Sequence, residues 1–262
     1  MMRAMWSGAA GMSAQALNMD TISNNLANVN TTGYKKARAE FQDLLYQTIN
    51  LAGTSSSVNT TLPTGIQLGH GARLQAVMHQ YSTGNFRSTM RDMDIAIEGA
   101  GFLQLTLPDG TIGYTRDGSF TKDQNGTLVN AAGYALNPQI TLPQDTLDLT
   151  IAKDGTVTIT QPGQPLAQQI GQITLVNFIN PTGLNHIGGN ILLQTQASGD
   201  PIEGQPGTDG LGGLAQGFLE MSNVDIADEM VNMIVGQRAY EANSKTIRTI
   251  DDMLSVVTNL KR

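Results

Sequence analysis

The hydrophobic pattern changes twice along this chain of 262 residues and divides it into two helical ends and a strand-rich middle. In the first 30 residues an apolar side chain recurs every seven positions, at Met5, Met12, Met19 and Leu26. In the last 40 residues, apolar and small side chains recur every three or four positions from Ile226 onward. Both patterns predict amphipathic helices with coiled-coil spacing.

Residues that favour helix ends lie at the expected places. Gly33 is a candidate C-cap for the first helix, and the candidate N-caps of the second are Ser222, Asn223 and Asp225. The first helix is weak by composition, because each of its interior glycines costs about 1 kcal/mol relative to alanine. We therefore expect it to depend on a partner.

Between the helices the hydrophobic period falls to two, as in strands. Apolar residues on both sides of Pro108-Asp109-Gly110 predict a β-hairpin, and the alternating segments 147–151 and 156–160 predict two further strands. By contrast, residues 50–65 and 198–213 are rich in turn-forming and small polar residues, and we expect them to be irregular.

Neither terminal helix is expected to be stable alone, because a lone amphipathic helix needs a partner for its apolar face. Two arrangements fit the periodicity. The ends can pair with each other and leave their outer faces for copies of the chain in an assembly, or both can pack on the β-rich middle as ordinary core. Periodicity alone does not separate these arrangements.

The composition narrows the class of protein. The absence of cysteine excludes disulfides and cysteine-ligated metal sites, and the net charge of −7 argues against a nucleic-acid binder. Residues 1–91 carry net +4, residues 92–229 net −13 and residues 230–262 net +2, so the two ends resemble each other in charge. No apolar run is long enough to span a membrane, and the first residues lack the apolar block of a Sec signal.

Candidate catalytic and metal-binding groups do not converge in the sequence. The three histidines are widely spaced and show no ligand pattern: His70, His79 and His186. Residues 123–126 lack the glycine and glutamate positions of a calcium loop, and Asp94 and Glu98 are better explained as solvent-facing positions of a strand. We therefore expect no catalytic residue, no cofactor and no metal ion, and a protein that is not an enzyme.

Long motifs lie at both ends of the chain. The first is Asn24-Asn25-Leu26-Ala27-Asn28-Val29-Asn30-Thr31-Thr32-Gly33-Tyr34-Lys35. The second consists of Ser222-Asn223-Val224-Asp225 and Met233-Ile234-Val235-Gly236-Gln237-Arg238-Ala239-Tyr240-Glu241-Ala242-Asn243-Ser244-Lys245. Together with segments 94–102 and 114–120, these motifs resemble the bacterial flagellar axial family of rod and hook proteins over essentially the whole chain.

The resemblance implies an α+β protein with a discontinuous architecture. Residues 1–33 and 222–262 would form one terminal α-helical coiled-coil domain, paired as the inner tube of a polymer. Residues 34–75 would connect it to a β-rich outer domain, residues 76–221. Within the connection, residues from about 46 to 66 are similar to the insertion that marks distal rod members of the family.

The function that the resemblance implies is that of a structural subunit of the distal rod in the flagellar basal body. Copies would polymerise helically into a rigid drive shaft that crosses the periplasm and transmits torque from motor to hook. The alternative is a proximal rod subunit of the same family. A β-rich binding or adhesion module with helical tails would follow only if the ends packed on its own core.

The resemblance also implies partners and a route of export. The expected partners are further copies of the chain, proximal rod proteins, the hook protein, the surrounding peptidoglycan-level and outer-membrane rings, and the flagellar type III export apparatus. Export without a cleaved Sec signal would follow from that apparatus. Neither nucleic acid nor direct membrane insertion is expected.

Two groups of residues are expected to carry this function. Residues of the inner helices would form the assembly interface, where methionines adapt to unequal contacts and asparagines fix the register: Met5, Met12, Met19, Asn24, Asn25, Leu26, Asn28, Met230, Met233, Gln237, Arg238, Tyr240, Asn243, Ile247, Leu254 and Leu260. Residues of the insertion would stiffen the rod: Tyr46, Leu62, Pro63, Gly65 and Ile66.

Overall fold

The structure, a computed structural model, contains two compact units and describes residues 2–53, 55–57, 60–61, 63–163 and 166–259. The helix–ribbon unit comprises Met1–Leu26, Ala37–Met78 and Asp225–Arg262. The β-rich unit comprises Ala27–Lys36 and His79–Val224. Helices at both ends and strands between them confirm the predicted α+β class.

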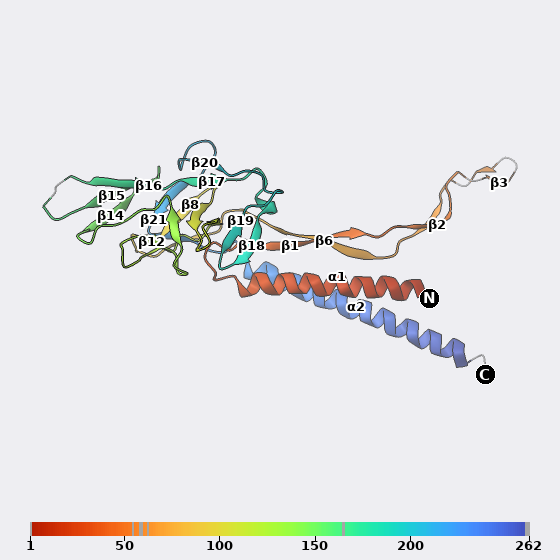
Figure 1. Cartoon of the computed structure of the whole chain (residues 1–262). Helices are drawn as coiled ribbons and strands as arrows, with labels where there is room; N and C mark the ends of the chain where they lie inside the picture. The colour runs from red at the N-terminus through yellow and green to blue at the C-terminus, as the bar shows by residue number, and fades with distance from the viewer. Residues whose placement is uncertain (1, 54, 58–59, 62, 164–165, 260–262) are drawn as a thin grey trace. The chain divides into compact units, whose positions relative to one another are not determined.

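The helix–ribbon unit contains both helices, α1 (Met2–Ala27) and α2 (Ile226–Asn259) (Figure 1). Asp225 caps α2, because its Oδ1 accepts a hydrogen bond of 2.8 Å from the backbone N–H of Ala227. α1 ends six residues before Gly33, so the prediction of Gly33 as its C-cap is wrong. The cause is local, since Asn28 accepts hydrogen bonds from both the N–H and the hydroxyl of Thr31 in place of a further helical turn.

The remainder of this unit is a long two-stranded ribbon. Its strands pair as β1 (Ala37–Asp43) with β6 (Ala72–His79), β2 (Gln47–Asn50) with β5 (Ile66–Leu68), and β3 (Ser55–Ser57) with β4 (Thr60–Thr61). The expectation of an irregular segment at 50–65 is therefore wrong for the strand residues described there. Serine and threonine fit a strand when the partner strand supplies the hydrogen bonds, so composition alone was a poor guide.

The β-rich unit is built on two antiparallel sheets. The larger has the order β11-β12-β13-β9-β10-β19-β18: β9 (Leu103–Thr106), β10 (Ile112–Thr115), β11 (Thr121–Lys122), β12 (Leu128–Val129), β13 (Ala135–Asn137), β18 (Asn185–Gly188) and β19 (Ile191–Leu193). The smaller consists of β14 (Asp148–Ile151), β15 (Thr156–Thr160) and β16 (Gln168–Gln172).

Three strand pairs and one short 3-10 helix complete this unit. The pairs are β7 (Phe86–Ser88) with β22 (Phe218–Glu220), β8 (Ile95–Glu98) with β21 (Gly213–Gln216), and β17 (Leu175–Asn177) with β20 (Ile202–Gly204). The 3-10 helix is η1 (Pro181–Gly183). β20 lies inside the segment 198–213, which was expected to be irregular, so that expectation is wrong for these three residues.

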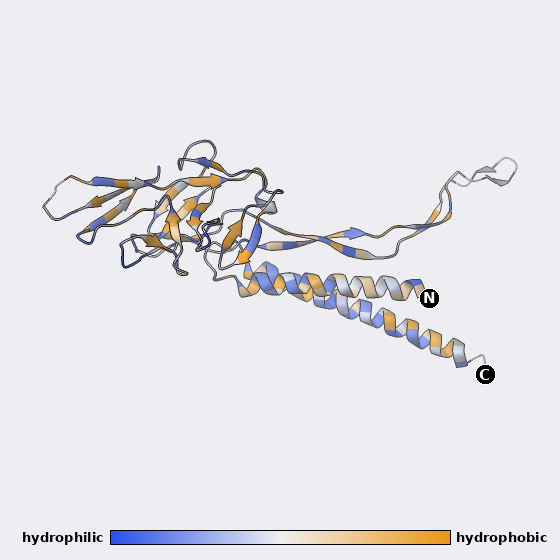
Figure 2. Cartoon of the chain, viewed as in Figure 1, coloured by the Kyte–Doolittle hydropathy of each residue, from blue (hydrophilic) through white to orange (hydrophobic). Residues whose placement is uncertain are grey.

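The predicted hairpins are confirmed by the pairing. β9 and β10 flank the Pro108-Asp109-Gly110 turn, with Thr106 opposite Ile112. In β14 and β15 the alternate apolar residues are buried, as the two-residue period requires: Leu149, Ile151, Val157 and Ile159. Apolar residues gather on the central strands of this unit, where they form its core (Figure 2).

Asp94 corrects one prediction from the sequence. We expected a solvent-facing carboxylate, yet Asp94 is 1% exposed. The three residues that follow it, Ile95 to Ile97, are buried on both faces of β8, so this strand has no solvent side on which polar residues could alternate. Arg91 lies beside the carboxylate, with Nη1 at 3.6 Å from Oδ1. Glu98 is exposed, as predicted.

Candidate functional site

The two helices pack closely because glycines lie at their contact. A Cβ atom at Gly8 would lie 3.0 Å from Cγ1 of Ile247, and one at Gly11 would lie 2.7 Å from Nδ2 of Asn243. Residues later in α1 thus contact residues earlier in α2, so the two helices are antiparallel. The prediction that the two ends pair with each other is confirmed.

A buried asparagine fixes the other end of this helix pair. Asn25 is 1% exposed, and its side-chain amide exchanges two hydrogen bonds with the backbone of Ala37 at 2.8 and 2.9 Å. Its Nδ2 also lies 3.4 Å from Oε2 of Glu229 in α2. One turn and a half earlier in α1, Met19 lies against Gly236, where a Cβ atom would be 3.3 Å from its Cγ. Asn25 therefore holds both β1 and α2 against α1.

Apolar side chains also cover the faces that the helices turn away from each other. With about 100° per residue, the exposed apolar residues of α2 lie roughly opposite its contacts with α1: Met230, Val231, Ile234, Val235, Met253 and Val256, all at least half exposed. In α1 the same holds for Met2 and Trp6, which are 70% and 72% exposed. Monomeric proteins rarely leave such a stripe uncovered, so this surface is suited to binding another chain.

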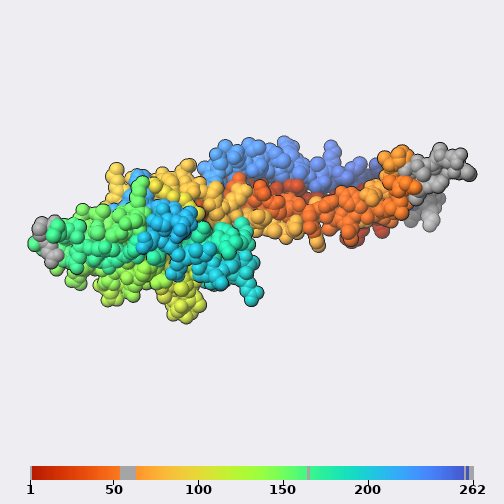
Figure 3. Space-filling model, turned by 90° about the horizontal axis from the view of Figure 1, so that it is seen from above, coloured from red at the N-terminus to blue at the C-terminus, as the bar shows by residue number. Residues whose placement is uncertain are grey.

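The ribbon follows α1 over part of its length (Figures 1 and 3). It contacts the helix at Ala37, through Asn25, and at Gly71, where a Cβ atom would lie 3.0 Å from Cβ of Ala10. Leu44 pairs with Gly71 through a hydrogen bond of 2.9 Å. The helix from residue 10 to 25 and the strand from residue 37 to 44 are each about 23 Å long. The equal lengths let the ribbon contact α1 at both ends of this stretch.

Beyond Leu44 the ribbon carries exposed apolar side chains. The exposed residues lie on β2, β5 and the segments beside them: Leu45, Tyr46, Ile49, Leu51, Ile66 and Leu68. A two-stranded ribbon by itself is marginally stable in water. This part of the chain is therefore a second surface that a neighbouring molecule would stabilise.

The structure distributes the predicted assembly residues over three environments. Asn25 is buried, and nine others are half-buried: Met5, Met12, Met19, Leu26, Asn28, Met233, Asn243, Ile247 and Leu254. Five are exposed: Asn24, Met230, Gln237, Arg238 and Tyr240. In the predicted insertion, Tyr46, Pro63, Gly65 and Ile66 are exposed. Leu62 and Leu260 lie outside the described residues.

The helix contact also includes residues that were not among the predicted site residues, among them Gly8, Gly11, Glu229 and Gly236. By composition, Gly8 and Gly11 indicate weak points of the first helix. Their signal was present, because a glycine in register with an apolar stripe permits close approach of a second backbone. Glu229 carried no comparable signal, since acidic residues are common in the first turn of any helix.

A buried ionic cluster lies in the β-rich unit. Lys35, Arg116 and Glu220 have side chains no more than 4% exposed. Nζ of Lys35 donates to Oε1 of Glu220 at 2.6 Å, and Nη1 of Arg116 donates to Oε2 at 3.3 Å. Burial lowers the pKa of Lys35 and of Arg116, and the Glu220 carboxylate opposes both shifts.

This cluster holds together three segments of the unit: the one before the ribbon, the one after it and the one before α2. Lys35 also donates to the carbonyl of Ser82 at 2.7 Å, and the N–H of Gly84 donates to Glu220 at 2.9 Å. Beside it, Nδ2 of Asn223 donates to the carbonyl of Gln80 at 2.8 Å. Segments around residues 35, 82, 116 and 220 thus meet at one set of charges.

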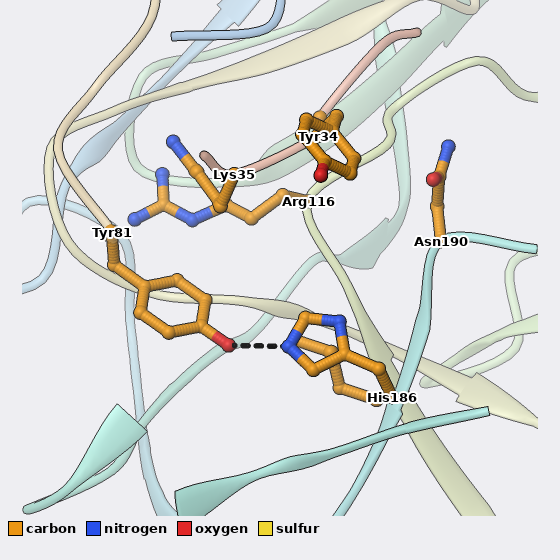
Figure 4. Close-up of a pocket in the computed structure, with 8 residues that line it drawn as sticks. Tyr34, Lys35, Tyr81, Arg116, His186 and Asn190 are labelled. Atoms are coloured by element: carbon orange, nitrogen blue, oxygen red, sulfur yellow. Dashed lines mark hydrogen bonds between the residues drawn. The ribbon is translucent and has the colours of Figure 1, made fainter. Parts of the chain in front are cut away.

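Next to the cluster lies a small cavity of about 40 Å³ (Figure 4). Its lining includes Lys35, Arg116, Tyr81 and His186, and the Tyr81 hydroxyl lies 3.2 Å from Nε2 of His186. Burial raises the pKa of Tyr81 to about 12. Burial and the stacked ring of His79, with centroids 3.8 Å apart, lower the pKa of His186 to about 4.

Among the described residues, no group of three or more His, Asp or Glu side chains is placed to hold a metal ion. Within the same residues, neither helix is long and apolar enough to cross a membrane.

Comparison with known proteins identifies the family. Residues 5–35 match the family described as "Flagella basal body rod protein", residues 96–159 match "Flagellar hook protein FlgE/F/G D1 domain", and residues 215–260 match "Flagellar basal body rod FlgEFG protein C-terminal". The chain is 52% identical to the flagellar basal-body rod protein FlgG of Borreliella burgdorferi and 42% identical to that of Bacillus subtilis. Both alignments cover all of this chain and all of the relative.

A flagellar protein with a different name is less similar to this chain than the FlgG proteins are. The flagellar hook-basal body complex protein FlhP of Bacillus subtilis is 30% identical, again over the whole of both chains. The identity to the FlgG proteins is higher throughout, and their family is structural rather than enzymatic. The chain therefore belongs to the FlgG family of flagellar basal-body rod proteins, which form the distal rod.

Proposed function

We propose that copies of this chain polymerise helically, with the α1–α2 pair on the inside of the rod, and that the polymer transmits torque from motor to hook. The division would be residues 1–33 and 222–262 inside, 76–221 outside and 34–75 between them. Membership of the rod family implies assembly with flagellar components. The observation that carries the proposal is the exposed apolar face of α2 opposite α1.

The two helices have separate tasks in this proposal. Their glycine-lined contact uses one face of each helix within the chain. Val231, Ile234 and Val235 remain for neighbouring copies, and burying each in the polymer contributes about 25 cal/mol per Å² of apolar surface. The predicted residues Met230, Gln237, Arg238 and Tyr240 are exposed and would contact those copies.

The outer part of the ribbon would brace neighbouring copies. Exposed Tyr46 and Ile66 support this role for residues 46–66, because an uncovered two-stranded ribbon gains stability from a neighbour. Its deletion is expected to give a rod that is softer or curved, and straight, stiff rods from the deletion would exclude the brace. The remaining partners proposed are the proximal rod, the hook, the surrounding rings and the type III export apparatus.

One pair of variants tests the assembly surface. Ile234→Asp places a charge beside Met230 and Val231 in the exposed apolar stretch. Thr249→Asp places the same charge on an exposed position where three of the four neighbours one turn away are polar: Lys245, Thr246 and Asp252. We expect Ile234→Asp to prevent sedimentable polymer and to abolish motility, whereas Thr249→Asp assembles. Trp6, the single tryptophan and 72% exposed, reports assembly by a blue shift of its emission.

Two results would contradict this proposal. Normal polymer from Ile234→Asp would exclude the α2 face as the interface between copies. Normal rods from a chain truncated before residue 250 would exclude the inner helices as the element of assembly, because the truncation removes the last turns of α2 together with Leu254. Circular dichroism of each monomer confirms that its helices are intact.

A further inference from the structure

The cavity beside the buried ionic cluster has an excess of positive charge. Lys35 and Arg116 both line it, whereas the carboxylate they share, Glu220, does not. Among the described residues, no second carboxylate lies within 4 Å of either cation. Two cations and one anion leave a net charge of +1 in a region shielded from water, and such a charge is costly unless it is compensated.

One donor of the cluster also lacks an acceptor. Nε of Arg116 is buried and has no hydrogen-bond partner among the described residues. Lys35 has acceptors for two of its three N–H groups, at Ser82 and Glu220. The side chain of Arg116 is 4% exposed, so bulk water does not supply the missing acceptor freely.

The remaining lining is suited to an anion and to nothing large. Tyr34 and Tyr81 line the same space as the two cations, and Asn190 lines its far side (Figure 4). The Tyr81 hydroxyl already contacts His186, and Nδ2 of Asn190 already donates to the carbonyl of Thr32 at 3.0 Å, so the charge comes from Lys35 and Arg116. A cavity of about 40 Å³ holds one small ion or water but excludes phosphate-containing metabolites. The size admits a water or a small ion, and the two cations together with the unpartnered Nε of Arg116 favour a small monovalent anion.

We propose that this cavity is a binding site for one small inorganic monovalent anion of the size of chloride. The ion completes the charge balance of Lys35, Arg116 and Glu220 and accepts from Arg116. Since this cluster joins the segments around residues 35, 82 and 220, anion binding stabilises the β-rich unit at the place where the chain enters and leaves it.

Thermal unfolding of the full-length monomer tests the proposal. Chloride is exchanged for gluconate at constant ionic strength, because gluconate exceeds the cavity in size and the exchange leaves charge screening unchanged. We expect one ion per chain, so that each tenfold rise in chloride above its dissociation constant lowers the unfolding equilibrium constant about tenfold. Bromide is expected to replace chloride. Equal stability in chloride and gluconate would overturn the proposal.

Variants and diffraction locate the ion. Arg116→Gln is expected to abolish the dependence on chloride, whereas Arg87→Gln, which removes an exposed arginine of the same unit, is expected to retain it. If Arg116→Gln does not fold, anomalous diffraction from crystals of the unaltered chain in bromide decides. A bromide peak between Lys35 and Arg116 supports the site, and bromide found only at the surface refutes it.

Discussion

Replacing Glu220 by glutamine tests the central role of the buried ionic cluster. The change preserves size but removes the carboxylate shared by Lys35 and Arg116, with contacts of 2.6 and 3.3 Å. It leaves two cations in a site where side chains are no more than 4% exposed. Breaking a buried ion pair on one side typically costs about 3–5 kcal/mol, and we expect a loss of that size in the free energy of unfolding.

The chain offers a matched control in the exposed pair of Arg238 and Glu241. These side chains are 78% and 65% exposed and 3.1 Å apart, so Glu241→Gln is expected to cost less than about 0.5 kcal/mol. Urea unfolding of both variants, followed by circular dichroism, measures the two losses. Adding Lys35→Met to Glu220→Gln should recover part of the larger loss, because it removes one uncompensated cation.

Two results would refute this reasoning. The first is a loss for Glu220→Gln no greater than that for Glu241→Gln, which would show that the cluster is not shielded from water. The second is strict additivity of Lys35→Met and Glu220→Gln, since residues that interact directly are expected to show a coupling energy.

The remaining predictions concern a helix contact and a histidine. Asn25→Ala is expected to lower the stability of the helix pair by about 2–4 kcal/mol, because it leaves both backbone groups of Ala37 without their partner. Asn232→Ala, at an exposed position of α2, is expected to change the stability by less than about 0.5 kcal/mol. Thermal unfolding, followed by circular dichroism at 222 nm, measures both changes. The pKa of His186 is about 4 in the folded chain against 6.5 unfolded, so the unfolded chain binds more protons between these values and stability should rise with pH from about 4 to about 6.5, then level off. His186→Gln should remove that slope, and an unchanged slope would assign it to other groups.

The period of the apolar residues was sufficient to predict the helices and strands that bury one face and expose the other. The stripe at each end became α1 and α2, and the alternation around Val157 became a strand with a buried face. It failed at Asp94, because burial on both faces of β8 depends on strands distant in sequence. It also failed in the ribbon, where hydrogen bonds across the hairpin outweigh a composition typical of linkers.

The candidate site was also predictable only where a local residue pattern marks it. Ile247, a member of the stripe in the second helix, lies on the helix contact, and Asn25 contacts Glu229 of α2. The ionic cluster was not predictable, because Lys35, Arg116 and Glu220 are far apart in sequence and no local pattern pairs them. Charge counting along the chain detected an uneven distribution but could not locate a buried excess.

Helical reconstruction of the polymer is the measurement that tests the assembly account most directly. The account predicts that α1 and α2 line the inside, with Val231, Ile234 and Val235 buried against neighbouring copies and Gly8 still packed on Ile247 within each chain. A reconstruction in which this face of α2 remains open to solvent, or in which strands of the β-rich unit line the inside, would contradict it.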